Sequence, residues 1–194
     1  MSRKAGANGN LRAVLPKQDR RIVEREVLPA YLEESLGIPV ELHEAAHRVR
    51  YDDGVEAIEV ADLEGLSAAV AMARALMPIK FSAAELKFLR KALGLTGKEL
   101  ANALETSVET VSRWENGQHM GGYVEKNYRL LICSLLKDRA PAVPYKPETI
   151  AFMKIKVPAD PNFRVPPMAF RRVHLQKMNS PTVEDAWGTS QAAA

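Results

Sequence analysis

The sequence has few of the features that mark secreted, metal-bound or membrane-embedded proteins. It contains one cysteine, Cys133, so neither an intrachain disulfide nor a cysteine-based zinc site can form. Its apolar runs are far shorter than the ~20 residues that a membrane-spanning helix needs. The polar residues 1–10 do not resemble a signal peptide. We therefore expect a protein of a reducing, cytoplasmic compartment with no membrane partner, in which Cys133 is a small core residue.

Motifs of catalysis are also missing. An acidic stretch follows His43 and His47, but no nucleophile motif or phosphate-binding loop accompanies its members, which are Asp52, Asp53, Glu56 and Glu59. A solvated acidic face explains these carboxylates more simply than an active site does. The two histidines are four residues apart, yet no further ligands complete a tetrahedral metal site. We therefore expect no enzyme, no cofactor and no metal.

Charge is unevenly distributed, although the net charge of the whole chain is only +3. By segment, the net charge is +5 over 1–21, −9 over 22–70, +4 over 71–140 and +3 over 141–194. The acidic block is a poor match for phosphate, whereas the basic block that follows it can lie against a polyanion. Ordinary solvated faces would give the same pattern, so charge alone leaves both interpretations open.

Hydrophobic periods and turn residues predict an α+β protein with extended basic tails. Asp53-Gly54 predicts a tight hairpin, because it supplies the positive φ angles that such a turn demands. The predicted segments are a flexible basic arm (1–20), a small antiparallel β-rich acidic domain ending in a helix (21–78), an all-α domain (79–139) and a proline-rich extended or disordered tail (140–194).

Capping residues predict where the helices begin. The candidates are Asp62, Ser82, Thr96 and Ser107, and a further helix is expected over 122–137. Ser82 and Thr96 are each followed three residues later by Glu, which makes a capping box. The helix over 62–77 has one apolar stripe, formed by Leu66, Val70, Ala73 and Met77.

Two of these helices are short and follow each other closely within residues 95–117. The first turns Leu100, Ala101 and Leu104 inward, and the second turns Val111 and Trp114 inward. This is the pattern of a helix-turn-helix. A generic helical hairpin would have the same caps and the same short turn. The prediction of a helix-turn-helix therefore depends on the residue types along the whole of 95–117.

The string resembles the lambda-repressor-like, or XRE-type, helix-turn-helix family. The likeness rests on Leu95-Thr96, Glu99-Leu100-Ala101, the Ser107 cap and the closing Ser112-Arg113-Trp114-Glu115-Asn116-Gly117. It implies a sequence-specific regulator of transcription that binds double-stranded DNA. A homodimeric repressor is expected, whose copies read half-sites about one helical turn apart. Glu105 stands where the family usually has Gly, which predicts a turn that is either slightly different or strained. Gly97 stands where a Gln often reaches DNA.

The resemblance implies roles for individual side chains. The helix capped by Ser107 enters the major groove, where each base pair shows a distinct pattern of donors and acceptors. The side chains expected to face the bases are Val108, Glu109, Ser112 and Arg113. Val108 could contact a thymine methyl group, Glu109 could accept from a cytosine amino group, and Arg113 could donate two hydrogen bonds to guanine. Contacts to phosphate are expected from Lys91, Lys98, Ser107, Thr110 and Gln118. Two alternatives stay open: Ser107 only caps its helix, or Arg113 only pairs with Glu109.

A wider resemblance covers residues 20–137. The strand-rich front, Asp62-Leu63-Glu64-Gly65-Leu66, and the string from Phe88 to Gly94 before the helix-turn-helix resemble MqsA-type antitoxins. Those proteins pair a zinc- and toxin-binding N-terminal domain with a dimerising DNA-binding domain, and they repress their own operons. This chain lacks the paired Cys-x-x-Cys zinc ligands. The resemblance implies an alternative function, an antitoxin whose acidic front domain binds a basic toxin.

The basic ends give one further hypothesis. Arg3, Lys4 and Arg12, or Arg171, Arg172 and Lys177, could follow the DNA backbone or the minor groove. Plain disorder is the simpler interpretation of both ends.

Overall fold

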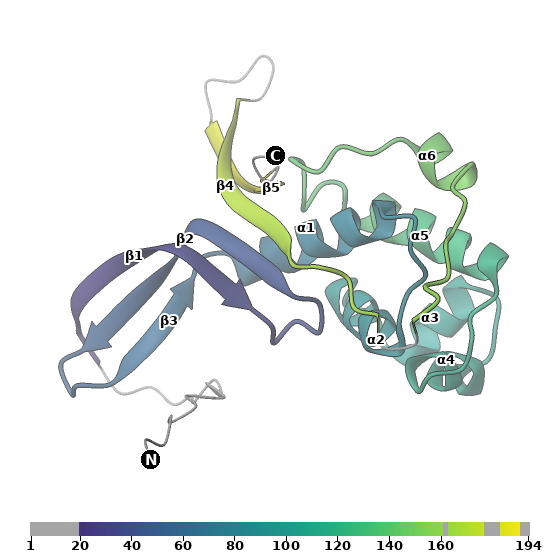
Figure 1. The fold of residues 1–194 in the computed structure, drawn as a ribbon, viewed down its shortest axis with the longest axis horizontal. Helices are drawn as coiled ribbons and strands as arrows, with labels where there is room; N and C mark the ends of the chain where they lie inside the picture. The colour runs from purple at the N-terminus through teal and green to yellow at the C-terminus, as the bar shows by residue number, and fades with distance from the viewer. Residues whose placement is uncertain (1–19, 161–162, 177–182, 191–194) are drawn as a thin grey trace.

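The computed structural model describes residues 20–160, 163–176 and 183–190. Figure 1 shows a sheet on one side of the molecule and a group of helices on the other, with α1 (Leu63–Leu76) between them. The expected α+β fold class is therefore confirmed. Arg3, Lys4 and Arg12 of the predicted arm, and Lys177, lie outside the described residues.

The described residues form one sheet of five strands, centred on β2 (Val40–Tyr51). β1 (Ile22–Glu33) pairs antiparallel with β2 along one edge. On the other edge, β3 (Glu56–Val60) pairs antiparallel with the end of β2, and β4 (Met168–Gln176) pairs parallel with its beginning. The predicted hairpin turn between β2 and β3 is present, with Gly54 at a φ of 81°.

A bulge interrupts β2 beside the two histidines. His43 lies opposite Ala30 and Ala46 lies opposite Leu28, so β2 has one more residue here than β1, and Glu44 has a φ of 52°. His43 and His47 thus lie on either side of the bulge. Among the residues that the structure describes, no three His, Cys, Asp or Glu side chains gather as a metal site requires.

The segment after residue 140 is not the extended or disordered tail that its prolines predict. It forms the short helix α6 (Pro147–Ala151) and then a hairpin of β4 and β5 (Val183–Thr189), which joins the sheet beside β2. The hairpin buries Phe170 and Trp187 in the core. These contacts are made to parts of the chain more than a hundred residues away, so no local pattern could show them.

The hairpin also fixes the start of α1. The Trp187 indole Nε1 donates to the Asp62 carbonyl oxygen at 3.0 Å, and the Arg172 guanidinium lies 3.2 Å from the Asp62 carboxylate. Arg172 also stacks on the Trp187 ring, with 5.0 Å between its central carbon and the ring centroid. Arg172 therefore holds the fold together here, while Arg171 remains exposed.

The other helices begin close to the predicted positions. They are α2 (Ala83–Ala92), α3 (Gly97–Ala103), α4 (Val108–Glu115) and α5 (Gly122–Leu136). The side chains of Asp62, Ser82, Thr96 and Ser107 each accept a hydrogen bond from the amide three residues on, and both predicted capping boxes are formed. The local sequence therefore fixes where these helices start.

One continuous core joins the sheet to the helices. Helix α1 is central to it, because α1 packs against β5, α2 and α5. Its burial extends well beyond the predicted stripe: Leu66 and Val70 are fully buried, but so are Ala68, Ala69, Ala71 and Met72. This core includes residues on both sides of residue 78, so it does not mark the domain boundary expected there, and that boundary remains a prediction.

Cys133 is fully buried in α5, as expected. Burial raises the pKa of its thiol to about 11, so the thiol is protonated at neutral pH and is a poor nucleophile. None of the described helices combines the length and the apolar character that a membrane crossing needs.

Candidate nucleic-acid interface

Helices α3 and α4 pack together through the residues that the sequence turns inward. Leu100 and Ala101 of α3 and Val111 and Trp114 of α4 are all buried. The Ser107 hydroxyl accepts from the Thr110 amide at 3.2 Å and so fixes the first turn of α4. The predicted helix-turn-helix geometry is therefore present.

The turn between these helices is strained at Glu105. This residue has a φ of 50°, in the left-handed region that costs a residue with a Cβ about 1–2 kcal/mol. The expectation of a strained turn is borne out by this angle. Only glycine adopts the conformation without steric cost.

Replacing Glu105 with glycine is expected to raise the free energy of unfolding by about 0.5–1 kcal/mol, because the relieved strain exceeds the backbone entropy that glycine loses. Urea unfolding followed by circular dichroism measures the change. A matched control is Lys87→Gly at an exposed position inside α2, which should lose about 1 kcal/mol. Equal losses in both variants would contradict the strain assigned to Glu105.

An ion pair fixes α4 to α2 from behind. The Arg90 guanidinium of α2 donates to both carboxylate oxygens of Glu115 at 2.6 and 3.1 Å, and it also donates to the Leu95 carbonyl oxygen at 3.0 Å. The hydrogen bond with Glu115 raises the pKa of Arg90 above its usual value. At the C-terminal end of α4, the side-chain amide of Asn116 donates to the Ser112 carbonyl oxygen at 2.7 Å. The sequence string contains Glu115, but it does not reveal the Arg90 partner.

The outward side of α4 is open. Val108, Glu109, Ser112 and Arg113 are all exposed, as predicted. Among the described residues, the Arg113 guanidinium has no direct hydrogen bond or ion pair, so the alternative in which it only pairs with Glu109 rests on a longer-range attraction between their charges. An exposed arginine fork without such a partner is free to donate to two acceptors on one base.

The Glu109 carboxyl group is held in its ionised form. Its own backbone amide, then the Ser107 hydroxyl and last the charge of Arg113 lower the pKa of Glu109 below its usual range. An ionised carboxylate only accepts hydrogen bonds, so Glu109 can accept from an amino group of a base but repels a phosphate. Ser107 thus both caps α4 and helps to keep this carboxylate ionised.

The residues predicted to contact phosphate fall into two groups. Lys91 in the last turn of α2, Lys98 in the first turn of α3 and Gln118 in the loop between α4 and α5 are all exposed. Ser107 and Thr110 are instead already bonded to each other, with 3.1 Å between their hydroxyl oxygens. Lys91, Lys98 and Gln118 are therefore the freer candidates for phosphate.

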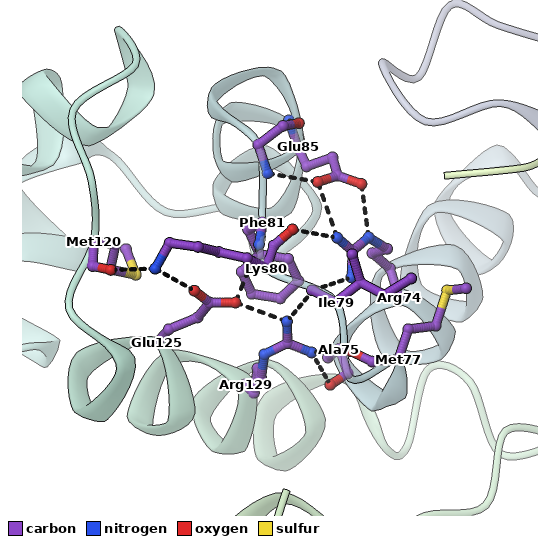
Figure 2. A network of polar contacts seen from close by, with 11 residues as sticks. Arg74, Ala75, Met77, Ile79, Lys80, Phe81, Glu85, Met120, Glu125 and Arg129 are labelled. Carbon is purple, nitrogen blue, oxygen red and sulfur yellow. Dashed lines mark hydrogen bonds and ion pairs between the residues drawn. The ribbon is translucent and has the colours of Figure 1, made fainter. Parts of the chain in front are cut away.

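A buried network of charges, shown in Figure 2, connects α1 to α2 and α5. Arg74 of α1 donates to both carboxylate oxygens of Glu85 at 2.6 and 3.0 Å, and the side chain of Arg74 is fully buried. The same Glu85 carboxylate accepts from the Ser82 amide at 2.6 Å. Glu85 therefore completes the capping box of α2 and ties α2 to α1.

The second half of the network centres on Arg129 of α5. Its guanidinium donates to the carbonyl oxygens of Ala75, Met77 and Ile79 at 2.6–2.7 Å. It also donates to Glu125 at 2.7 Å, and burial lowers the pKa of Arg129 while Glu125 opposes that change. These carbonyls lie at the end of α1 and just beyond it, so Arg129 closes the helix that Pro78 stops.

Phe81 lies between the two buried arginines. The central guanidinium carbons of Arg74 and Arg129 are 4.8 and 4.0 Å from its ring centroid. Lys80 next to it lies 3.4 Å from Glu125 and donates to the Met120 carbonyl oxygen at 2.6 Å, directly before α5. Sequence reasoning missed this network. Its only signals are Arg74 within an apolar run and Glu125 and Arg129 spaced four apart on the inner face of α5.

Comparison with known families supports the assignment of this region. Residues 86–120 match a family model described as Helix-turn-helix, from within α2 through α4. The match supports a DNA-binding regulator domain of the XRE type. No curated protein and no solved structure matched the chain, and the likeness to MqsA-type antitoxins is not confirmed.

Proposed function

We propose that this protein is a cytoplasmic, homodimeric repressor of transcription that reads the major groove of DNA with α4. One observation carries the proposal: α4 is anchored from behind by Trp114 and by the pair of Arg90 with Glu115, while its outward side chains are exposed. A rigid helix with a free polar face is what reading of base edges requires.

Three outward side chains have chemistry that distinguishes bases. Arg113 can donate two hydrogen bonds to guanine, and the ionised Glu109 can accept from the amino group of cytosine. Val108, 45% exposed at the first position of α4, can contact a thymine methyl group. Lys91, Lys98 and Gln118 are proposed to set the register through phosphate contacts, with Ser107 and Thr110 in supporting positions. Ser112 is proposed to face the bases beside Arg113.

Gel-shift titration with DNA from upstream of the protein's own gene tests the proposal. Arg113→Ala is expected to weaken binding by roughly 5- to 150-fold, the equivalent of one lost base contact. Arg48→Ala is the matched control, because Arg48 is an exposed arginine on β2 and the strand β2 lies far from α4 in Figure 1. This variant should bind as the wild type does. Identical affinities of wild type and Arg113→Ala would contradict the proposed role of α4.

A second function, that of an antitoxin, is favoured by the front of the chain. The strands of residues 22–60 carry a large excess of carboxylates, and the edge strand β1 exposes Val23, Val27 and Leu32. An acidic surface with exposed apolar side chains suits a basic protein partner. If a neighbouring gene encodes a small basic ribonuclease-like protein, the two should copurify, and failure to do so would argue against this function.

A further inference from the structure

The segment after α6, residues 153–158, forms an extended strap with two lysines on its outer side. Met153 is buried in the core and Ile155 packs against the core, whereas Lys154 and Lys156 are exposed. Successive side chains of an extended segment point to opposite sides, so the two lysines lie on the same outward face. The strap therefore presents two neighbouring positive charges to solvent.

No carboxylate along the strap neutralises these charges. The stretch between Glu148 and Asp160 contains no Asp or Glu. Among the described residues, neither lysine ammonium group has a hydrogen bond or an ion pair. Asp160 lies beyond the strap, where it lines a cavity together with Glu34 and Arg164, and neither lysine borders that cavity. Two exposed cations without such partners suit a polyanion.

Hydrogen bonds fix the strap in place at both ends. The Lys126 ammonium group of α5 donates to the Ala151 carbonyl oxygen, just before the strap, at 2.8 Å. Further along, the Lys80 amide donates to the Lys156 carbonyl oxygen at 2.9 Å, and the Lys156 amide donates to the Pro78 carbonyl oxygen at 2.8 Å. The outward direction of the lysines thus rests on a backbone that is bonded to the helical part of the fold.

The strap lies beside the loop that joins α4 to α5. The side chain of Lys80, whose backbone pairs with the strap, donates to the Met120 carbonyl oxygen of that loop at 2.6 Å (Figure 2). His119 of the loop and Val157 of the strap line the same cavity. Gln118, proposed above to contact phosphate, directly precedes His119. A duplex carries a phosphate charge about every 1.7 Å along its axis, so DNA that meets this loop has further phosphates next to it.

We propose that Lys154 and Lys156 contact phosphates of the DNA that flanks the bases read by α4. The inference rests on the proposed function and extends its interface to a part of the chain outside the matched helix-turn-helix region. The basic residues of the hairpin lie elsewhere, since Arg172 is held in an ion pair at the start of α1 and Arg171 is on β4. Phosphate contacts carry no sequence information, so the strap adds affinity and salt dependence rather than specificity.

Fluorescence anisotropy titration of the full chain with duplex DNA, between about 50 and 200 mM KCl, tests the inference. The variant Lys154→Gln/Lys156→Gln is expected to lower the slope of log affinity against log salt by about 1.8 for each bound copy, or about 0.9 for each lost contact. Over this range the affinity of the wild type should therefore fall roughly tenfold more than that of the variant. The weakening should be the same on the recognised sequence and on unrelated DNA.

Lys137→Gln/Arg171→Gln is the matched control, because it removes the same charge from two other exposed positions. Lys137 follows the last turn of α5, roughly 20 Å from the start of that helix, and β4 with Arg171 lies far from α4 in Figure 1. This variant should keep the wild-type slope. Lys154→Arg/Lys156→Arg should keep it too, because arginine retains the positive charge. Thermal unfolding checks that all variants fold.

An unchanged slope in the Lys154→Gln/Lys156→Gln variant would overturn the inference, and so would an equal reduction in the control, which would report net charge alone. A loss confined to the recognised sequence would also contradict it, since every duplex has phosphates. If Arg113→Ala loses affinity while the strap variant keeps its slope, only the inference about the strap fails. If the wild type binds no duplex DNA, the proposed function fails as well.

Discussion

Replacing Arg129 with methionine is expected to cost about 3–5 kcal/mol of the free energy of unfolding, the usual result of removing one partner of a buried ion pair. The substitution leaves the carbonyl oxygens of Ala75 and Met77 without their side-chain donor, while Ile79 still accepts from Arg74. It also removes one of the two cations beside Glu125. Methionine fills a similar volume, so the loss reports polar contacts rather than a cavity. Urea unfolding followed by circular dichroism measures it.

An exposed ion pair provides the control for this prediction. Arg48 lies 3.1 Å from Glu26, but both side chains are more than half exposed. Arg48→Met should therefore change the free energy of unfolding by no more than about 1 kcal/mol. A loss at Arg129 as small as the loss at Arg48 would show that the network does not hold the helices together.

Truncating Trp114 to alanine is expected to cost about 3–5 kcal/mol, as for other large aromatic side chains in a core. Trp114 is 7% exposed and packs on the inner side of α4, opposite the face proposed to read DNA. The variant should also bind DNA weakly, although no outward side chain has changed, because α4 loses the contact that positions it.

Trp114→Phe separates the two effects. Phenylalanine keeps an aromatic ring in the core, so this variant should retain more stability and more DNA affinity than Trp114→Ala. Thermal unfolding and gel-shift titration on the same samples give both quantities. A Trp114→Ala variant as stable as the wild type would contradict the packing described for α4.

The helical half of the fold could be predicted because its signals are local. Each helix cap joins a side chain to an amide three residues further on, so a short stretch of sequence is enough to recognise it. The capping residues are Asp62, Ser82, Thr96 and Ser107. The same holds for the outward face of α4, where a short string defines which side chains point away from the core. These features needed no knowledge of distant contacts.

The hairpin of β4 and β5 could not be predicted in this way. It reaches the sheet through a parallel pairing with β2, more than a hundred residues earlier, and the sequence around its strands is rich in prolines. Trp187 has a defined environment only once α1 and the sheet are in place. Pairings of such separation leave little trace in a single sequence.

The anchors of the candidate site were missed for a related reason. Arg90 and Glu115 are 25 residues apart, and Arg129 bonds carbonyls of α1 about twice as far away. Charged residues on helices are usually interpreted as solvent-facing. Only the tertiary arrangement shows that Arg129 is buried and that Arg90 and Glu115 are largely shielded from water. The sequence thus predicted the residues proposed to contact DNA but not those that hold them.

Selection of bound sequences from a pool of random duplex DNA tests the central claim most directly. The account predicts that the wild type enriches one recurring sequence containing a guanine at a fixed position, and that Arg113→Ala loses the preference for that guanine while keeping the others. Failure of the wild type to enrich any sequence, or an unchanged preference in the variant, would contradict the proposal that α4 reads DNA.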